Sequence, residues 1–228
     1  MRGKFITFEG GEGTGKSTQV ELLARTLVKK GWDVVVTKEP GGTEVGKEIR
    51  RLLVCGDKDK MDATAEALLY YADRHIHMVQ KILPALENGK IVISDRFADS
   101  TKAYQCYGYG ERVSKEVVDE LYRIAVGDFK PDLTIVLDID PEKGLRRSFA
   151  KADNMAEKEL RFESRALEFH TNLREGFKII AEEEPERCVV LDADKSIDEL
   201  HQSVMNVVEQ RLGLFTEKCD SNHIEEIG

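Results

Sequence analysis

Short, continuously apolar runs alternate along the chain with longer stretches in which apolar residues return every three or four positions. Uninterrupted runs of this length are typical of strands buried in a parallel sheet, whereas the longer stretches have the periodicity of amphipathic helices. The runs occupy residues 5–8, 34–36, 90–94, 133–137 and 188–191. The alternation of the two patterns predicts an α/β fold in which helices flank a five-stranded parallel sheet.

The longest helical pattern spans residues 62–87 and has two distinct faces. The positions that we predict to be buried on one face are Leu68, Ala72, His75, Val79, Ile82 and Leu86. Tyr70, Arg74 and His77 lie roughly opposite, and Tyr70 and Arg74, four residues apart, are neighbours on that face. These two side chains could stack on a flat base and donate to its edge, although an exposed polar helix face has the same pattern.

Residues 1–212 carry all of these patterns without an internal repeat or a long linker, and we expect them to form one domain. The remaining residues, 213–228, are largely polar and aperiodic, which predicts a disordered tail. No apolar stretch approaches the roughly 20 residues that span a membrane, and residues 1–4 lead into the first strand without an export signal. We therefore expect a cytoplasmic protein without a membrane anchor.

Charge and cysteine spacing narrow the possible partners. The net charge of −9 argues against a nucleic-acid backbone as the main partner, so an anionic substrate needs local cations. The cysteines, at positions 55, 106, 188 and 219, are far apart and predict reduced thiols. Neither they nor the histidines have the spacing of a dedicated metal site.

A glycine-rich motif follows the first predicted strand. Gly10-Gly11-Glu12-Gly13-Thr14-Gly15-Lys16-Ser17 fits the pattern of a glycine, four variable residues and then Gly-Lys-Ser/Thr, and a predicted helix follows it. In this context, backbone N–H groups at the helix N-terminus converge on phosphate oxygens. Lys16 would reach the β- and γ-phosphates and the Ser17 hydroxyl a Mg²⁺ ion. The alternative is a chance glycine-rich turn, and the flanking elements argue against it.

Two other strand ends carry side chains suited to a phosphorylated ligand. Glu39-Pro40-Gly41-Gly42 follows the second strand and Asp95-Arg96 ends the third, and open α/β sheets bind ligands at this carboxyl edge. Asp95 could help to hold Mg²⁺ and Arg96 could grip a phosphate bidentately, whereas the alternative is a simple surface ion pair. Arg50, on the helix predicted after Gly42, is either a substrate contact or an exposed charge.

Two later segments could complete a site. Ser100, Thr101, Tyr104 and Gln105 offer hydroxyl and amide groups for directional hydrogen bonds to a base or sugar, unless they form an ordinary connecting loop. Residues 143–165 are dense in Lys and Arg, which suits either a cationic flap over phosphates or an exposed helical hairpin.

Together these groups resemble the bacterial thymidylate kinases over about residues 3–212. The segments that carry the resemblance are Phe8-Glu9-Gly10 through Ser17-Thr18, Lys38-Glu39-Pro40-Gly41-Gly42-Thr43, Ala72-Asp73-Arg74, Asp95-Arg96-Phe97, Ser100-Thr101 with Ala103-Tyr104-Gln105, and Pro131-Asp132-Leu133-Thr134 with Leu137-Asp138. A phosphate loop alone is widespread. Glu-Pro-Gly-Gly-Thr, Asp-Arg-Phe and Ala-Tyr-Gln in this order are far more specific.

The resemblance implies the P-loop nucleoside monophosphate kinase fold, transfer of the γ-phosphoryl group of ATP to dTMP with Mg²⁺, and a homodimer. It implies that ATP is bound by Gly10, Gly11, Glu12, Gly13, Thr14, Gly15, Lys16, Ser17 and Thr18. Lys16 would hold the transferring phosphates. Ser17 would serve the metal, and Asp95 would act close to the metal or the acceptor phosphate.

For the acceptor dTMP, the resemblance implies that Arg96 grips the phosphate, that Glu12 lies near the sugar 3′-hydroxyl and that Tyr104 crowds the 2′ position. Thymine would stack on Tyr70, where the family usually has a phenylalanine, and its edge would be read by Arg74 and Thr101. The other acceptor contacts that we expect are Glu39, Pro40, Arg50, Ser100 and Gln105.

The phosphate loop has no arginine between Gly10 and Lys16, so it resembles the bacterial arrangement in which a mobile lid, here about residues 147–161, supplies the catalytic arginine. Arg147 and Arg161 are the candidates, ahead of Arg146. Residues 159–163 read Glu-Leu-Arg-Phe-Glu where the family commonly has Gly-x-x-Asp-Arg. Lys38 and Cys106 also depart from the family pattern, which commonly has an arginine and a glycine at these positions.

Two alternatives stay open at this point. The first is another nucleotide or deoxynucleoside kinase, with a different acceptor. The second, from a different class, is a P-loop GTPase or ATPase regulatory module. The chain has no Asn-Lys-x-Asp segment to read guanine, and such a switch would have little use for Tyr70, Arg74 and Tyr104 as a second site.

Overall fold

The computed structural model describes residues 2–57, 59–110, 112–152, 162 and 165–215, and its centre is a parallel sheet. The predicted strands are confirmed as β1 (Phe5–Glu9), β2 (Val34–Lys38), β3 (Ile91–Asp95), β4 (Leu133–Asp138) and β5 (Cys188–Asp192). They form one five-stranded sheet in the order β2-β3-β1-β4-β5. Because β1 lies between β3 and β4, its carboxyl end is a topological switch point, where open α/β sheets bind ligands.

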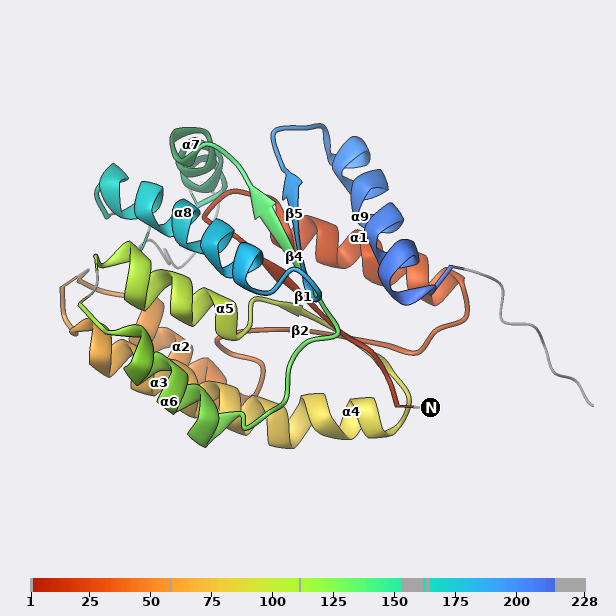
Figure 1. Cartoon of the computed structure of the whole chain (residues 1–228), viewed down its shortest axis with the longest axis horizontal. Helices are drawn as coiled ribbons and strands as arrows, with labels where there is room; N and C mark the ends of the chain where they lie inside the picture. The colour runs from red at the N-terminus through yellow and green to blue at the C-terminus, as the bar shows by residue number, and fades with distance from the viewer. Residues whose placement is uncertain (1, 58, 111, 153–161, 163–164, 216–228) are drawn as a thin grey trace, which may run out of the picture.

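Helices cover both faces of the sheet (Figure 1). They are α1 (Lys16–Lys29), α2 (Glu44–Val54), α3 (Ala63–His77), the π-helical η1 (Met78–Ile82), α4 (Leu83–Glu87), α5 (Ala98–Thr101), the π-helical η2 (Lys102–Gly108), α6 (Lys115–Ala125), α7 (Pro141–Ala152), α8 (Leu167–Glu183) and α9 (Ile197–Leu212). Successive residues of a strand point to opposite faces. Accordingly, Ile6 and Phe8 pack in the core under α1 and α9, whereas Phe5 packs in the core formed with α3, η1, α4 and α6.

The helix over residues 62–87 shows that one burial prediction was wrong. Leu68 and Val79 are 53% and 54% exposed, and Ala72 and His75 are also exposed. The π-helical turns of η1 shift the phase of the helix, so that Ile82 and Leu86 still reach the core. Arg74 and His77 are buried instead, because this polar face points toward the candidate site, where its side chains find partners.

The end of the domain lies slightly beyond residue 212. Gly213 ends α9 with a positive φ of 62°, and Leu214 is buried in the core beside Trp32, whose indole Nε1 donates to the Leu214 carbonyl at 2.8 Å. Residues 213–215 of the predicted tail therefore pack on the domain, and the rest of that tail lies outside the described residues. Within the described ranges, the helices are all too short or too polar to cross a membrane.

Candidate active site

The glycine-rich motif forms the loop between β1 and α1. Gly10, Gly13 and Gly15 have positive φ values of 130°, 66° and 93°, which glycine adopts without strain. At Gly13 there is also no room for a side chain, because a Cβ would lie 1.9 Å from the carbonyl oxygen of Gly144 in α7. The loop therefore needs glycine for its turn and for the close approach of α7.

Lys16 lies back over this loop. Its Nζ donates to the carbonyl oxygens of Gly10 at 3.1 Å and Gly11 at 2.6 Å, and to Thr14 Oγ1 at 3.3 Å. Burial and the neighbouring Arg96 guanidinium lower the pKa of Lys16 to about 8. Thr18, also predicted to bind ATP, is exposed in the first turn of α1. The cradle thus combines backbone N–H groups at a helix N-terminus with a buried ammonium group, which together suit a polyphosphate.

Ser17 and Asp95 meet beside the loop, as predicted for two residues that serve one metal ion. Ser17 Oγ donates to Asp95 Oδ2 at 2.6 Å. The described part of the chain contains no group of three or more His, Cys, Asp or Glu side chains that could hold a metal by themselves. A hydroxyl and a carboxylate suit Mg²⁺, which typically takes few protein ligands and completes its shell with substrate phosphates and water.

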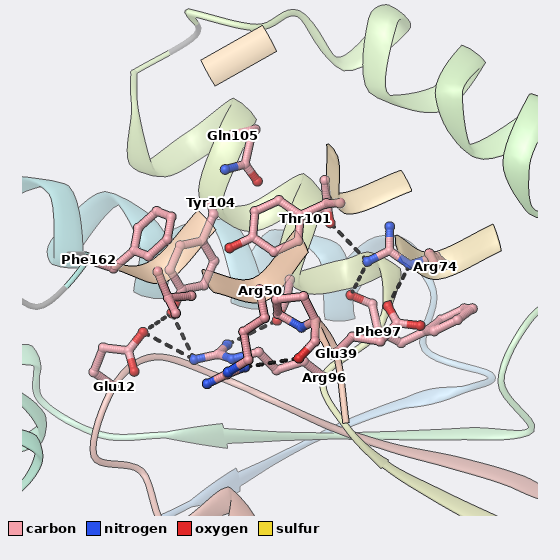
Figure 2. A pocket seen from close by; sticks show the side chains of 14 residues that line it. Glu12, Glu39, Arg50, Arg74, Arg96, Phe97, Thr101, Tyr104, Gln105 and Phe162 are labelled. Atoms are coloured by element: carbon pink, nitrogen blue, oxygen red, sulfur yellow. Dashed lines mark hydrogen bonds and ion pairs between the residues drawn. The ribbon is translucent and has the colours of Figure 1, made fainter. Parts of the chain in front are cut away.

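A pocket beside the loop brings together every residue that we predicted to contact the acceptor substrate (Figure 2). Its lining consists of Glu12, Glu39, Pro40, Arg50, Val54, Tyr70, Arg74, Arg96, Phe97, Ser100, Thr101, Tyr104, Gln105 and Phe162. Val54, Phe97 and Phe162 are the members that sequence reasoning missed. Phe162 is 5% exposed and meets Tyr104 edge to face, with 5.3 Å between ring centroids. An aromatic residue within the otherwise charge-dense segment 143–165 is unusual, and that pattern could have identified Phe162 as a buried contact.

Arg96 projects from the end of β3 toward the phosphate loop. Its Nη1 donates to the Gly10 carbonyl at 2.9 Å and to Ser100 Oγ at 3.0 Å, and its Nη2 donates to Tyr104 Oη at 2.9 Å. Nη2 also forms an ion pair with Glu12 Oε1 at 3.2 Å, and the Tyr104 hydroxyl donates to the same carboxylate. Burial alone would raise the pKa of Glu12, but Arg96 and Lys16 hold that pKa below its usual value.

The backbone of Arg96 is strained. Its φ of +74° is the one positive value for a non-glycine residue in the part of the chain that the structure describes. A long side chain in this conformation costs about 1–3 kcal/mol and persists only where its surroundings enforce it. Such strain is typical of residues whose direction matters for a site.

Arg74 lies at the opposite end of the pocket and is 1% exposed (Figure 2). Its Nε donates to Glu39 Oε2 at 2.8 Å, and its Nη2 donates to the Phe97 carbonyl and to Thr101 Oγ1, both at 3.0 Å. A second set of contacts fixes Glu39, because His77 Nδ1 lies 2.9 Å from Glu39 Oε1 and His77 Nε2 lies 2.6 Å from Thr37 Oγ1. Arg74 is therefore held rigidly at the pocket wall.

Two buried polar atoms in this pocket have no hydrogen-bond partner among the described residues: Arg74 Nη1 and Gln105 Oε1. Gln105 is fully buried, and its Nε2 donates to Glu66 Oε2 at 2.9 Å, which fixes the other half of its amide. Native proteins rarely leave buried polar groups unpaired, so each such group needs an explanation. Both residues line the pocket, so a bound ligand is the nearest source of the missing acceptor and donor, although both atoms are themselves almost fully enclosed by protein.

The predicted lid residues are only partly described. Arg147, in α7, has Nη1 at 3.2 Å from the Ala193 carbonyl, to which it donates, and Nη2 at 3.6 Å from Asp194 Oδ1. Arg161 lies outside the described residues.

Arg50 lines the acceptor pocket, as predicted for a substrate contact. Its Nη1 donates to the Pro40 carbonyl at 3.0 Å.

The chain is similar to known proteins over most of its length. The family model described as thymidylate kinase matches residues 8–204. A thymidylate kinase of Halothermothrix orenii is 48% identical over 91% of this chain and 97% of its own length. One of Maridesulfovibrio salexigens is 47% identical over 91% and 96%. A crystal structure of thymidylate kinase from Ehrlichia chaffeensis superposes with a TM-score of 0.73 at 35% identity, and the match covers 92% of this chain and 99% of that chain.

Proposed function

The chain belongs to the thymidylate kinase family, and from this premise we infer that it transfers the γ-phosphoryl group of ATP to dTMP, giving ADP and dTDP. The observation that carries this conclusion is the acceptor pocket, which is lined by Arg74 and Gln105 at one end and by Arg96 at the other. A pyrimidine nucleotide has a base edge that can bind Arg74 and Gln105, and a phosphate that can bind the Arg96 guanidinium.

We propose the following arrangement of the acceptor. Arg96 binds the dTMP phosphate at the end of the pocket nearest the phosphate loop. Glu12 lies near the sugar 3′-hydroxyl, and Tyr104 stands against the 2′ position. Arg74 Nη1 donates to a thymine carbonyl, Gln105 Oε1 accepts the ring N–H, and Thr101 lies at the same edge of the base. Thymine stacks on Tyr70, which lines the pocket.

Phosphoryl transfer needs alignment and neutralisation of charge more than covalent chemistry. We propose that Lys16 and the backbone N–H groups of residues 10–18 hold the ATP phosphates. Arg96 donates to the Gly10 carbonyl of this loop at 2.9 Å, so a dTMP phosphate bound to Arg96 would lie close to the ATP phosphates. Ser17 and Asp95 would hold Mg²⁺, which supplies positive charge between the phosphate oxygens. A serine hydroxyl and a carboxylate are the oxygen ligands that this ion takes in kinases.

The acceptor assignment can be tested by coupled measurement of ADP release with dTMP, dUMP, dGMP and thymidine. We expect the highest kcat/KM with dTMP and a value about 10- to 200-fold lower with dUMP, because one missing methyl group is worth that much discrimination. Activity should vanish with EDTA and return with Mg²⁺. Preference for thymidine or dGMP would identify a different kinase, and tight GDP binding without dTMP-dependent ADP release would identify a switch protein.

We also propose that the protein is a cytoplasmic homodimer. Leu68 and Val79, on α3 and η1, and Val117 and Ile124, on the neighbouring α6, are between 43% and 66% exposed, and clusters of exposed apolar side chains mark interaction surfaces. Light scattering behind size exclusion should give about twice the chain mass of 25.8 kDa. A Leu68→Glu variant should shift the mass toward the monomer, and a monomeric native protein at micromolar concentration would refute the dimer.

A further inference from the structure

Glu9, the last residue of β1, lies at the centre of the contacts around Arg96. It is fully buried, and the apolar strand that carries it ends where the phosphate loop begins. Its Oε1 accepts the backbone N–H of Phe97 at 2.7 Å, and its Oε2 accepts a hydrogen bond from the Ser100 hydroxyl. Each carboxyl oxygen of Glu9 therefore binds a group adjacent to Arg96 in sequence or in space.

The first contact concerns the backbone. Arg96 has a positive φ, and three hydrogen bonds surround this residue. Its own N–H donates to the Phe8 carbonyl at 2.9 Å, its carbonyl accepts from Ser94 Oγ at 2.7 Å, and the next N–H, that of Phe97, binds Glu9. Of these three bonds, the one to Glu9 comes from a side chain outside β3. It fixes the peptide group between Arg96 and Phe97.

The second contact concerns the guanidinium. Ser100 Oγ donates to Glu9 Oε2 and at the same time accepts from Arg96 Nη1 at 3.0 Å. The hydroxyl proton is therefore directed toward Glu9, which leaves the oxygen lone pairs of Ser100 for Arg96. Without Glu9, the hydroxyl could rotate, and this orientation of the guanidinium would lose its support.

We propose that Glu9 is a positioning residue for the acceptor phosphate, because it fixes the direction of Arg96 through the Phe97 N–H and through Ser100. The inference rests on the proposed function, in which Arg96 binds the dTMP phosphate. Glu9 itself touches neither substrate. Its effect is confined to ligands that carry the phosphate.

The chemistry of the site requires two polar atoms at this position more than it requires a charge. Burial, reinforced by the neighbouring Asp99, raises the pKa of Glu9 to about 8, so this position favours a charged carboxylate less than an exposed position does. Glutamine has the same shape: its Oε1 keeps an acceptor for the Phe97 N–H, and its Nε2 would donate to Ser100 Oγ, which still has a lone pair for Arg96 Nη1. A Glu9→Gln variant should therefore rescue what a Glu9→Ala variant loses.

The experiment measures the dissociation constants of dTMP and thymidine by calorimetry for the native protein and for both variants. We expect Glu9→Ala to weaken dTMP binding about 10- to 100-fold, the range for the loss of one or two buried hydrogen bonds, and to change thymidine binding less than about threefold. Glu9→Gln should keep the native ratio of the two constants within about threefold. Thymidine binding by Glu9→Ala also reports that this variant is folded.

Thr7→Val is the matched control, because Thr7 is buried in the same strand and its Oγ1 pairs with Thr134 Oγ1 at 2.8 Å, away from Arg96. It should lower the unfolding temperature without changing the ratio of dTMP to thymidine affinity. If Glu9→Ala does not fold, Ser100→Ala tests the guanidinium route and should weaken dTMP binding about 3- to 10-fold.

The outcomes separate this inference from the proposed function. If the native protein phosphorylates dTMP but Glu9→Ala weakens dTMP and thymidine equally, or neither, the positioning role is overturned while the function stands. If the native protein does not turn over dTMP, the proposed function itself fails. Loss of phosphate discrimination in Glu9→Ala together with its rescue in Glu9→Gln supports the positioning role.

Discussion

An Arg96→Ala enzyme should lose about 10³-fold in kcat/KM for dTMP, the lower end of the 10³ to 10⁵ that an arginine on the transferring phosphoryl group contributes, because Arg96 acts on the neighbouring acceptor phosphate. The guanidinium is the half-buried cation that joins the acceptor pocket to the phosphate loop, through Ser100 and the Gly10 carbonyl. Without it, the carboxylate of Glu12 loses its ion pair and would repel the incoming phosphate. Steady-state kinetics at saturating ATP, with dTMP varied, measures the effect.

Two further variants test the cause of this loss. Arg96→Lys keeps the charge but not the planar fork, and it should recover only part of the activity because an ammonium group cannot form the same bidentate contact. Arg123→Ala removes an arginine of similar chemistry from the exposed surface of α6, where it pairs with Glu120, and should leave the kinetics unchanged. An Arg96→Ala enzyme within tenfold of the native kcat/KM would mean that another group binds the acceptor phosphate.

The architecture was predictable because its signals are local. Continuous apolar runs identified all five strands, and the glycine-rich motif identified the turn from β1 into α1. The failure came in the helix over residues 62–87, where a constant period of 3.6 residues was assumed. The π-helical turns of η1 change that period from residue 78 onward, so the face that buries Ile82 and Leu86 does not continue back to Leu68, which is exposed.

The candidate site was predictable where residues lie at strand ends, because parallel strands bring their carboxyl ends to one edge. This reasoning placed Asp95 and Arg96 beside Ser17 and the phosphate loop, and the structure brings them together. It could not identify the supporting contacts. Glu9 looks like one polar residue at the end of an apolar strand, and its role depends on the distance from β1 to the turn after β3, which no spacing in the sequence encodes.

The same limit applies to the buried pair of Glu39 and Arg74. The helical spacing of Tyr70 and Arg74 suggested a base-reading face, but it did not show that Glu39, 35 residues earlier, would hold Arg74 at 2.8 Å. Burying a charged side chain to 1% exposure costs free energy unless the charge is paired. The partner of Arg74 is Glu39, which follows the end of β2. Tertiary pairing therefore reversed the expectation that the apolar face of this helix would be the buried one.

The second large effect should arise in the segment that we predicted to be a lid. Because the phosphate loop has no arginine between Gly10 and Lys16, we expect one of Arg147→Ala and Arg161→Ala to lower kcat about 10³- to 10⁵-fold with a much smaller change in KM, and the other to cost far less. An arginine that acts on the transferring phosphoryl group stabilises the transition state more than bound ATP. Single-turnover measurements of dTDP formation isolate this step from product release.

Arg147 lies on α7, a helix that packs against the phosphate loop. Gly144, one helical turn earlier, lies so close to the phosphate loop that a Cβ there would be 2.4 Å from the Glu12 carbonyl oxygen, so α7, which carries Arg147, packs against this loop. The Arg147 guanidinium donates to the Ala193 carbonyl and pairs with Asp194. Arg146, the third candidate, is 68% exposed and pairs loosely with Glu142, so Arg146→Ala should keep near-native kcat, and Arg123→Ala on α6 is the control outside the candidates. If Arg147→Ala and Arg161→Ala both stayed within tenfold of native kcat, the charge on the transferring group would have to come from outside the lid, and Lys16 with Mg²⁺ would carry it alone.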